Sequence, residues 1–144
     1  MTITFALATP NDVADFQRID YDVFDNPVAP ASLKAFLDDH RHHIAIAKDG
    51  GAIIGFVSAI DYVHPDKPRE LWINEVGVAS AWRGKGVAKQ LLSMMLAHGR
   101  DMGCAEAWVV TEPENVPANA LYRSIADEGD AEPTLLTLHS FKLT

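Results

Sequence analysis

Residues 78–88 read Val-Ala-Ser-Ala-Trp-Arg-Gly-Lys-Gly-Val-Ala, and this stretch decides the fold. An apolar run, Leu71–Val78, precedes it, and a run with helical periodicity, Val87–Met102, follows it. A glycine-containing turn between a strand and a helix leaves backbone N–H groups unpaired at the helix N-terminus, where they can bind an anion. Arg83 and Lys85 add positive charge at this turn. The stretch therefore predicts a phosphate-binding turn.

Two common phosphate-binding motifs do not match this turn. A P-loop requires a glycine where this chain has Ala79, five positions before the Gly-Lys pair. A dinucleotide-binding fingerprint requires Gly or Ala three positions after Gly86, and Lys89 stands there. The pattern Arg/Gln-x-x-Gly-x-Gly/Ala does match, through residues 83–88. An ordinary glycine-containing loop before a helix is the alternative to this motif.

A second motif lies further along the chain. The sequence Asn115-Val-Pro-Ala118-Asn-Ala-Leu121-Tyr122 fits Asn-x-x-Ala-x-x-Leu-Tyr at all four fixed positions. Its last three fixed residues share one face of a helix, because they lie three and four positions apart. Together the two motifs resemble those of the GCN5-related N-acetyltransferases (GNAT), which hold the pyrophosphate of acetyl-CoA with such a turn. The resemblance is clear over residues 71–122.

The resemblance implies an α+β fold, with a mostly antiparallel central sheet, one splayed parallel pair of strands and about four flanking helices. Thr9 and Asp12 form a capping pattern that predicts a helix start, and Asn26–Pro30 predicts its end. We expect one domain over residues 1–144. The sequence pattern predicts strands at 2–7, 44–48, 52–60, 70–78, 107–111 and within 134–143, a loop at 64–68, and further helices at 32–39, 86–102 and 116–125.

The resemblance also assigns roles to residues. Backbone N–H groups of Val76 and Val78 would bind the pantetheine arm, and Asn115 would contact its amide. Tyr122 matches the general acid near the sulfur, although a half-buried core tyrosine is the alternative. Glu75 stands where related enzymes carry the acid that takes the amine proton, often through water; a strand acid paired with a base is the alternative. The residues of the turn that would bind the pyrophosphate are Arg83, Gly84, Lys85, Gly86, Val87 and Ala88.

The chain carries a net charge of −8, which makes binding to nucleic acid through a basic face improbable. An acidic surface attracts cations, and Glu112, Glu114 and Asp127 are candidates for a rim that binds a cationic acceptor. Acidity that serves only solubility is the alternative. After Tyr122 no glycine occurs before Gly129, which departs from the usual family pattern on the acceptor side.

The segment Pro117–Tyr122, Glu75 before Val-Gly-Val and the ending Leu-His-Ser-Phe resemble the short aminoglycoside 3-N-acetyltransferases. The prediction is therefore an acetyl-CoA-dependent N-acetyltransferase in which an aminoglycoside amine attacks acetyl-CoA directly in a ternary complex. Another amine, such as a polyamine, an amino acid or a protein lysine, is the alternative acceptor. A non-catalytic CoA-binding regulatory domain is the alternative function.

Other sequence features bear on the location of the protein and on disulfide and metal sites. No apolar run is long enough to span a bilayer, and the N-terminal residues show no secretory signal, so we expect a cytoplasmic protein without a membrane partner. A single cysteine, Cys104, excludes an internal disulfide and a multi-cysteine metal site. His40-Arg-His42-His43 has no acidic partner at ligand spacing, so we expect a helix end there and no metal. The sequence leaves open whether the chain forms a homodimer.

Overall fold

A computed structural model describes residues 2–127 and 129–144 of the chain. It divides the chain into two compact units, Met1–Val110 and Thr111–Thr144, which are described separately below. The described elements, with 3-10 helices labelled η, are β1 (Ile3–Leu7), η1 (Pro10–Gln17), α1 (Pro30–Asp38), β2 (His42–Asp49), β3 (Ala52–His64), β4 (Lys67–Val78), η2 (Ser80–Trp82), α2 (Val87–Asp101), β5 (Glu106–Val109) and α3 (Val116–Ile125).

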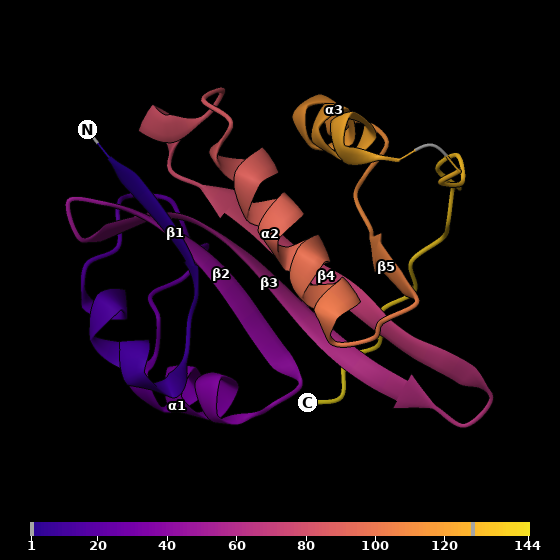
Figure 1. Ribbon diagram of the computed structural model, residues 1–144, viewed down its shortest axis with the longest axis horizontal. Coiled ribbons are helices and arrows are strands. Elements are labelled where there is room, and N and C mark those ends of the chain that lie inside the picture. The colour runs from indigo at the N-terminus through magenta and orange to yellow at the C-terminus, as the bar shows by residue number, and fades with distance from the viewer. Residues whose placement is uncertain (1, 128) are drawn as a thin grey trace. The chain divides into compact units, whose positions relative to one another are not determined.

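The first unit is built on a five-stranded sheet with the strand order β1-β2-β3-β4-β5 (Figure 1). Strands β1 to β4 form an antiparallel meander, and β4 pairs with β5 in parallel. This parallel pair was expected, because the helix α2 joins the two strands and carries the chain back across the sheet. The mixed sheet and its flanking helices confirm the predicted α+β fold.

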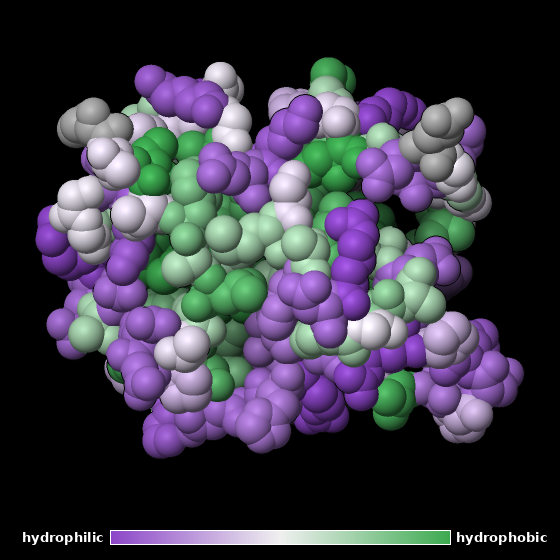
Figure 2. Space-filling view, in the orientation of Figure 1, coloured by the Kyte–Doolittle hydropathy of each residue, from purple (hydrophilic) through white to green (hydrophobic). Residues whose placement is uncertain are grey.

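The strands β2 and β3 are buried on both faces. On β2, Ile44 and Ile46 pack into one hydrophobic cluster with Phe16 of η1 and Leu37 of α1. The alternate residues of the same strand, Ala45 and Ala47, are also buried and face the other side. There α2 crosses β2, β3 and β4 (Figure 1). The space-filling view of this side shows hydrophilic residues along much of the margin and apolar residues between them (Figure 2).

The segment between β1 and α1 differs from the prediction. Thr9 and Asp12 form the expected capping box, but the helix that follows is a 3-10 helix and ends at Gln17. Residues 18–29 then form a long loop rather than more helix. The loop is held by the sheet, because Asp20 N–H donates to the Ile53 carbonyl at 2.8 Å, in competition with any continued helix.

The β3–β4 hairpin is longer than predicted. The loop expected at 64–68 reduces to two residues, Pro65 and Asp66, because His64 pairs directly with Lys67 across the hairpin. The longest described helix, α2, has 15 residues, and none of the helices in the described residues is long and apolar enough to cross a membrane.

His42 and His43, expected at a solvated helix end, belong instead to β2, whereas His40 lies in the turn before it. His43 is largely buried, and its Nε2 lies 2.6 Å from a carboxylate oxygen of Asp61 on β3. His98 of α2 contacts the other ring nitrogen of His43 at 3.0 Å. Partial burial, with the nearby His43, lowers the pKa of His98. This polar chain joins α2 to the sheet.

The second unit contains one regular element among its described residues, the helix α3. Asn115 caps the helix, because its side-chain oxygen accepts a hydrogen bond from Ala118 N–H at 3.1 Å. The strand predicted within 134–143 is wrong, since residues 131–144 form neither helix nor strand. A strand needs a ladder partner, and the described part of this unit supplies none. The large apolar side chains exposed there are Leu135, Leu136, Leu138, Phe141 and Leu143.

Gly77 of β4 offers a direct test of how tightly the loop 18–29 packs on the sheet. A methyl group added at Gly77 would lie 2.4 Å from the Val23 carbonyl oxygen and 2.6 Å from a ring carbon of Phe56. We expect Gly77→Ala to lower the free energy of unfolding by about 1–3 kcal/mol, because overpacking forces backbone shifts. Urea unfolding measures this, with Asn74→Ala on the same strand as the control. A Gly77→Ala variant as stable as the wild type would contradict the observed packing.

Candidate active site

Strand β4 opens in its second half. It pairs with β5 only from Glu70 to Ile73, so the residues after Ile73 have no partner on that side within the sheet. On the other side, the pairing with β3 skips Asn74, which makes a β-bulge just before Glu75. Bulges bend a strand and are frequent next to functional sites. The bulge and the short ladder together leave residues 74–78 bonded along one edge only.

The free edge of this segment carries backbone donors. Ala79 N–H donates to the Ile54 carbonyl of β3 at 2.9 Å. Because N–H directions alternate along a strand, those of Val76 and Val78 point away from β3 and toward the open side. These are the two residues expected to bind an extended substrate arm. Their geometry suits hydrogen bonding to an amide chain laid along β4.

The predicted turn leads directly from this segment into α2. Gly84 and Gly86 have φ angles of +73° and +81°, a conformation that glycine adopts without strain. The first intrahelical bond runs from Gln90 N–H to the Gly86 carbonyl, so the N–H groups of residues 87–89 have no partner within the helix. No atom lies within 4 Å of a methyl group built at either glycine. The turn therefore has donors and room for an anion such as a pyrophosphate.

The two cations of the turn are placed differently. Arg83 donates from Nε to the Val78 carbonyl at 3.1 Å and approaches a carboxylate oxygen of Asp22 at 3.8 Å. Lys85 lies above the ring of Trp82, with Nζ 5.8 Å from the ring centre. Both side chains are exposed, so both can turn toward a phosphate at the start of α2. Val87 is buried and offers only its backbone N–H, whereas Ala88 is half-buried.

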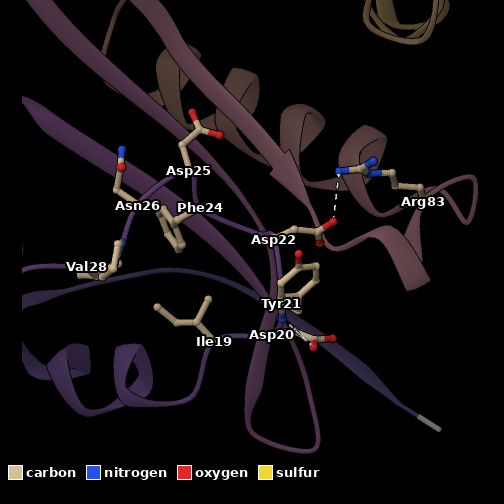
Figure 3. A pocket seen from close by; sticks show the side chains of 10 residues that line it. Ile19, Asp20, Tyr21, Asp22, Phe24, Asp25, Asn26, Val28 and Arg83 are labelled. Atoms are coloured by element: carbon tan, nitrogen blue, oxygen red, sulfur yellow. Dashed lines mark hydrogen bonds and ion pairs between the residues drawn. The ribbon is translucent and has the colours of Figure 1, made fainter.

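A cavity of about 600 Å³ lies beside this turn, between the loop 18–29 and Arg83 (Figure 3). Three of its lining residues are acids that the sequence analysis did not single out: Asp20, Asp22 and Asp25. Figure 3 shows Asp22 directed at Arg83 and Asp25 on a separate part of the loop. The sequence feature that could have indicated these acids is the run Ile19–Asp25, in which three acids occur within seven residues. The remaining lining residues are Ile19, Tyr21, Phe24, Asn26, Pro27, Val28 and Arg83.

The cavity wall is anchored at three successive loop residues. Asp22 accepts hydrogen bonds from both the backbone N–H (2.9 Å) and the hydroxyl of Ser80. These bonds, together with Arg83, lower the pKa of Asp22, so it stays ionised in the folded protein. Val23 is buried, and Phe24 stacks on Phe56 of β3 with ring centres 4.1 Å apart. The loop is thus fixed against the open half of β4.

Glu75 meets this loop. Partial burial, a hydrogen bond to Asp25 and the negative charge of Asp25 raise the pKa of the Glu75 carboxyl above its ordinary value. A carboxyl group with a raised pKa is better matched to accepting a proton near neutral pH than an ordinary surface glutamate is. The alternative role, an acid paired with a basic residue, is not observed, because the neighbour that acts on Glu75 is another acid.

The second unit carries the remaining predicted residues. Tyr122 is half-buried on α3, and burial raises the pKa of its phenol, which keeps the hydroxyl protonated at neutral pH. Asn119 was missed by the sequence analysis. Its side-chain amide donates to the carbonyls of Glu112 at 3.0 Å and Asn115 at 2.8 Å, which fixes the turn before the helix. The side-chain oxygen of Asn115 caps α3.

Three residues of the proposed acidic rim lie in the second unit. Glu112, Glu114 and Asp127 are exposed and belong to the second unit, so their role toward a cationic acceptor stays a prediction. The acids that line the cavity of the first unit come from the loop 18–29 instead. Cys104 is half-buried with a raised thiol pKa, which suits a packing role rather than a reactive thiolate.

Comparison with known proteins agrees with this architecture. Residues 8–126 match the family described as the acetyltransferase (GNAT) family. The chain is 31% identical over 87 residues to L-2,4-diaminobutyric acid acetyltransferase of Virgibacillus pantothenticus, covering 60% of this chain and 54% of that protein. It is 26% identical over 125 residues to N-alpha-acetyltransferase RimI of Mycobacterium tuberculosis, covering 85% and 77%. The chain spans about half the length of several curated relatives that it matches.

Solved structures share the fold. An aminoglycoside acetyltransferase from an uncultured soil metagenomic sample, crystallised with sisomicin, superposes with a TM-score of 0.79 at 16% identity, over 97% of both chains. Aminoglycoside N-acetyltransferase AAC(6')-Iy in complex with CoA gives a TM-score of 0.70 at 20% identity, over 96% of this chain and 95% of that one. The regiochemistry named there is 6′, and the 3-N position rests on the sequence resemblance alone.

An opened parallel strand pair, a glycine turn at a helix N-terminus and a family match over most of the sequence define one class of protein. The chain belongs to the GNAT acetyltransferase family.

The turn can be tested by adding charge at Gly86, the residue that caps α2. We expect Gly86→Asp to weaken binding of acetyl-CoA by at least about tenfold relative to Gly86→Asn, because only Asp places a negative charge against a bound phosphate. Asn and Asp are nearly the same size, and both favour helix caps, so the fold should survive in each variant. Calorimetric titration measures the affinities. Equal affinity of the two variants would show that the phosphates bind elsewhere.

Proposed function

We propose that the chain is an acetyl-CoA-dependent N-acetyltransferase that acetylates a primary amine of a small cationic acceptor. The observation that carries this proposal is the continuity of three features along one stretch, residues 74–89. An acid with a raised pKa, a strand edge with free N–H donors and an anion-binding helix start follow one another there. Family membership supplies the chemistry that such a stretch serves.

In this proposal acetyl-CoA supplies an activated thioester. The residues of the turn, 83–88, hold its pyrophosphate, and the N–H groups of Val76 and Val78 bind the pantetheine arm and polarise the thioester carbonyl. Asn115 contributes a further contact to the arm.

The acceptor amine attacks the thioester carbonyl carbon directly, while both substrates are bound. Glu75 takes a proton from the amine nitrogen, directly or through a water molecule, as the N–C bond forms. The C–S bond breaks, and Tyr122 of the second unit gives its proton to the sulfur. Burial raises the pKa of the Tyr122 phenol, so the hydroxyl is protonated at neutral pH and has a proton to give.

The acceptor is proposed from the charge of the cavity. Asp20 and Asp25 line it without a paired cation among the contacts described, and a polyamine-like or aminoglycoside acceptor would bring ammonium groups to them. An aminoglycoside acceptor, by resemblance at the 3-N position, is the first candidate. A diamino acid is the second, because the relative from Virgibacillus pantothenticus is named for L-2,4-diaminobutyric acid.

A panel assay separates these acceptors. Release of CoA thiol from acetyl-CoA would be measured with gentamicin, sisomicin, spermidine, L-2,4-diaminobutyrate and an N-terminal peptide. Turnover of an aminoglycoside that weakens with salt supports the first acceptor, because screening over about 8 Å reduces exposed charge attraction. Acetyl-CoA binding without turnover of any amine would favour a non-catalytic CoA-binding domain.

Glu75→Gln tests the general base. The amide cannot accept the amine proton, so we expect kcat to fall by about 10²-fold or more, while acetyl-CoA affinity stays near that of the wild type. The rise of kcat/KM with pH should also flatten, because the wild-type rise reports deprotonation of Glu75 through its raised pKa. A stopped assay over pH 5–9 measures both effects. Unchanged turnover would remove Glu75 from the mechanism.

Tyr122→Phe tests the general acid. Only the hydroxyl is lost, so we expect kcat to fall by about 10²-fold, with little change in KM for acetyl-CoA. The reason is that the hydroxyl acts as the C–S bond breaks and contributes little to binding. Steady-state kinetics measure the separate effects on kcat and KM, under conditions where the chemical step limits the rate. A rise in KM alone would make Tyr122 a packing residue.

A further inference from the structure

Two carboxyl groups meet where β4 opens, and only one of them was expected. Glu75 and Asp25 lie fifty positions apart in sequence, on the bulged strand and on the loop 18–29, and they share a hydrogen bond. Both residues are exposed. Neighbouring carboxyl groups repel when both are ionised, so a common proton or a bound cation stabilises such a pair.

The backbone fixes this meeting independently of the acids. Gly77 and Glu75 are two positions apart on β4, so their side-chain directions fall on the same face of the sheet. A methyl group at Gly77 would touch the Val23 carbonyl, which shows that this face lies against the loop. Phe24 stacks on Phe56, the partner of Gly77 across the ladder. Asp25 follows Phe24 directly, so its position opposite Glu75 is set by the anchored backbone.

The other groups around Glu75 leave Asp25 as its main electrostatic partner. On β3 the residue opposite Glu75 is Ser58, which is buried and neutral. On the loop, Asp22 is occupied by Ser80 and Arg83. Asp20 lies in the same cavity wall, but its carboxylate accepts a hydrogen bond from Tyr21 N–H. No basic side chain among the described residues is paired with Glu75.

We propose that Asp25 is a positioning residue for Glu75: it holds the Glu75 carboxyl at the opening of β4, and the two groups share one proton while the acceptor cavity is empty. This inference rests on the proposed function, in which Glu75 is the base. The proton sits on a Glu75 oxygen and is donated to the Asp25 carboxylate. When a cationic amine enters, its positive charge replaces the shared proton, which leaves to solvent, and Glu75 becomes a free base beside the amine.

The shared proton can be tested directly, without a measurement of catalytic activity. The δ-carboxyl carbons of glutamate would be labelled with ¹³C, the Glu75 signal assigned by its loss in Glu75→Gln, and its titration followed by NMR. Asp25→Asn keeps the size of the side chain and removes its charge. We expect it to lower the titration midpoint of Glu75 by roughly half a pH unit or more. Asp20→Asn makes the same change in the same cavity wall and should move the midpoint much less. Equal midpoints in wild type and Asp25→Asn would overturn the inference.

A kinetic arm tests the consequence for catalysis. With whichever amine of the acceptor panel is turned over, the acid limb of kcat/KM should move to lower pH in Asp25→Asn, because Glu75 loses its proton more readily. Asp25→Glu should restore the wild-type limb in part, which a merely structural role would not predict. If Asp25→Asn shifts the NMR titration midpoint of Glu75 but leaves the acid limb of kcat/KM unchanged, the positioning role is contradicted. Full turnover by Glu75→Gln would instead refute the proposed function and leave the NMR result standing.

Discussion

The open half of β4 is the constraint on which the rest of the site depends. Backbone N–H and C=O groups of a strand need hydrogen-bond partners. A strand with one free edge therefore forms these hydrogen bonds with water or with a ligand. Here the bulge at Asn74 and the short ladder to β5 leave residues 75–78 in that condition. The same bend delivers the chain to the turn before α2. The proposed contacts to pantetheine and to pyrophosphate therefore both follow from the separation of β4 from β5 after Ile73.

The loop 18–29 adds a cavity wall beside this opening. It could have been a mobile connection, but it is fixed by a buried valine, by the stack of Phe24 on Phe56 and by the bonds of Asp22 to Ser80. Ser80 lies in η2, immediately after β4. The cavity wall is consequently attached to the same short segment that carries the glycine turn. Arg83 contacts both parts, because it approaches Asp22 and donates to the Val78 carbonyl.

What the sequence could predict follows from how local each feature is. The glycine turn before α2, the capping box at Thr9 and the helix α3 depend on residues close in sequence, and all were predicted. The acids of the cavity were not, because their importance arises from contacts with β3 and β4 far along the chain. His43 was assigned to a helix end for the same reason, since its partner Asp61 is eighteen positions away. The strand expected within 134–143 had a suitable pattern, but a pattern supplies no ladder partner.

Net charge alone does not locate the acids that could bind a cationic acceptor. A surplus of eight negative charges can lie anywhere on a surface, and the acids of the second unit first drew attention because they cluster in sequence. The structure shows that an acid gains chemical significance from what surrounds it. Asp22 is tied to Ser80 and Arg83 and is a structural ion, whereas Asp25 faces another carboxyl and has no cation of its own among the contacts described. An unpaired acid beside a base is where an ammonium group is most strongly attracted, and this distinguishes the two residues although they lie three positions apart.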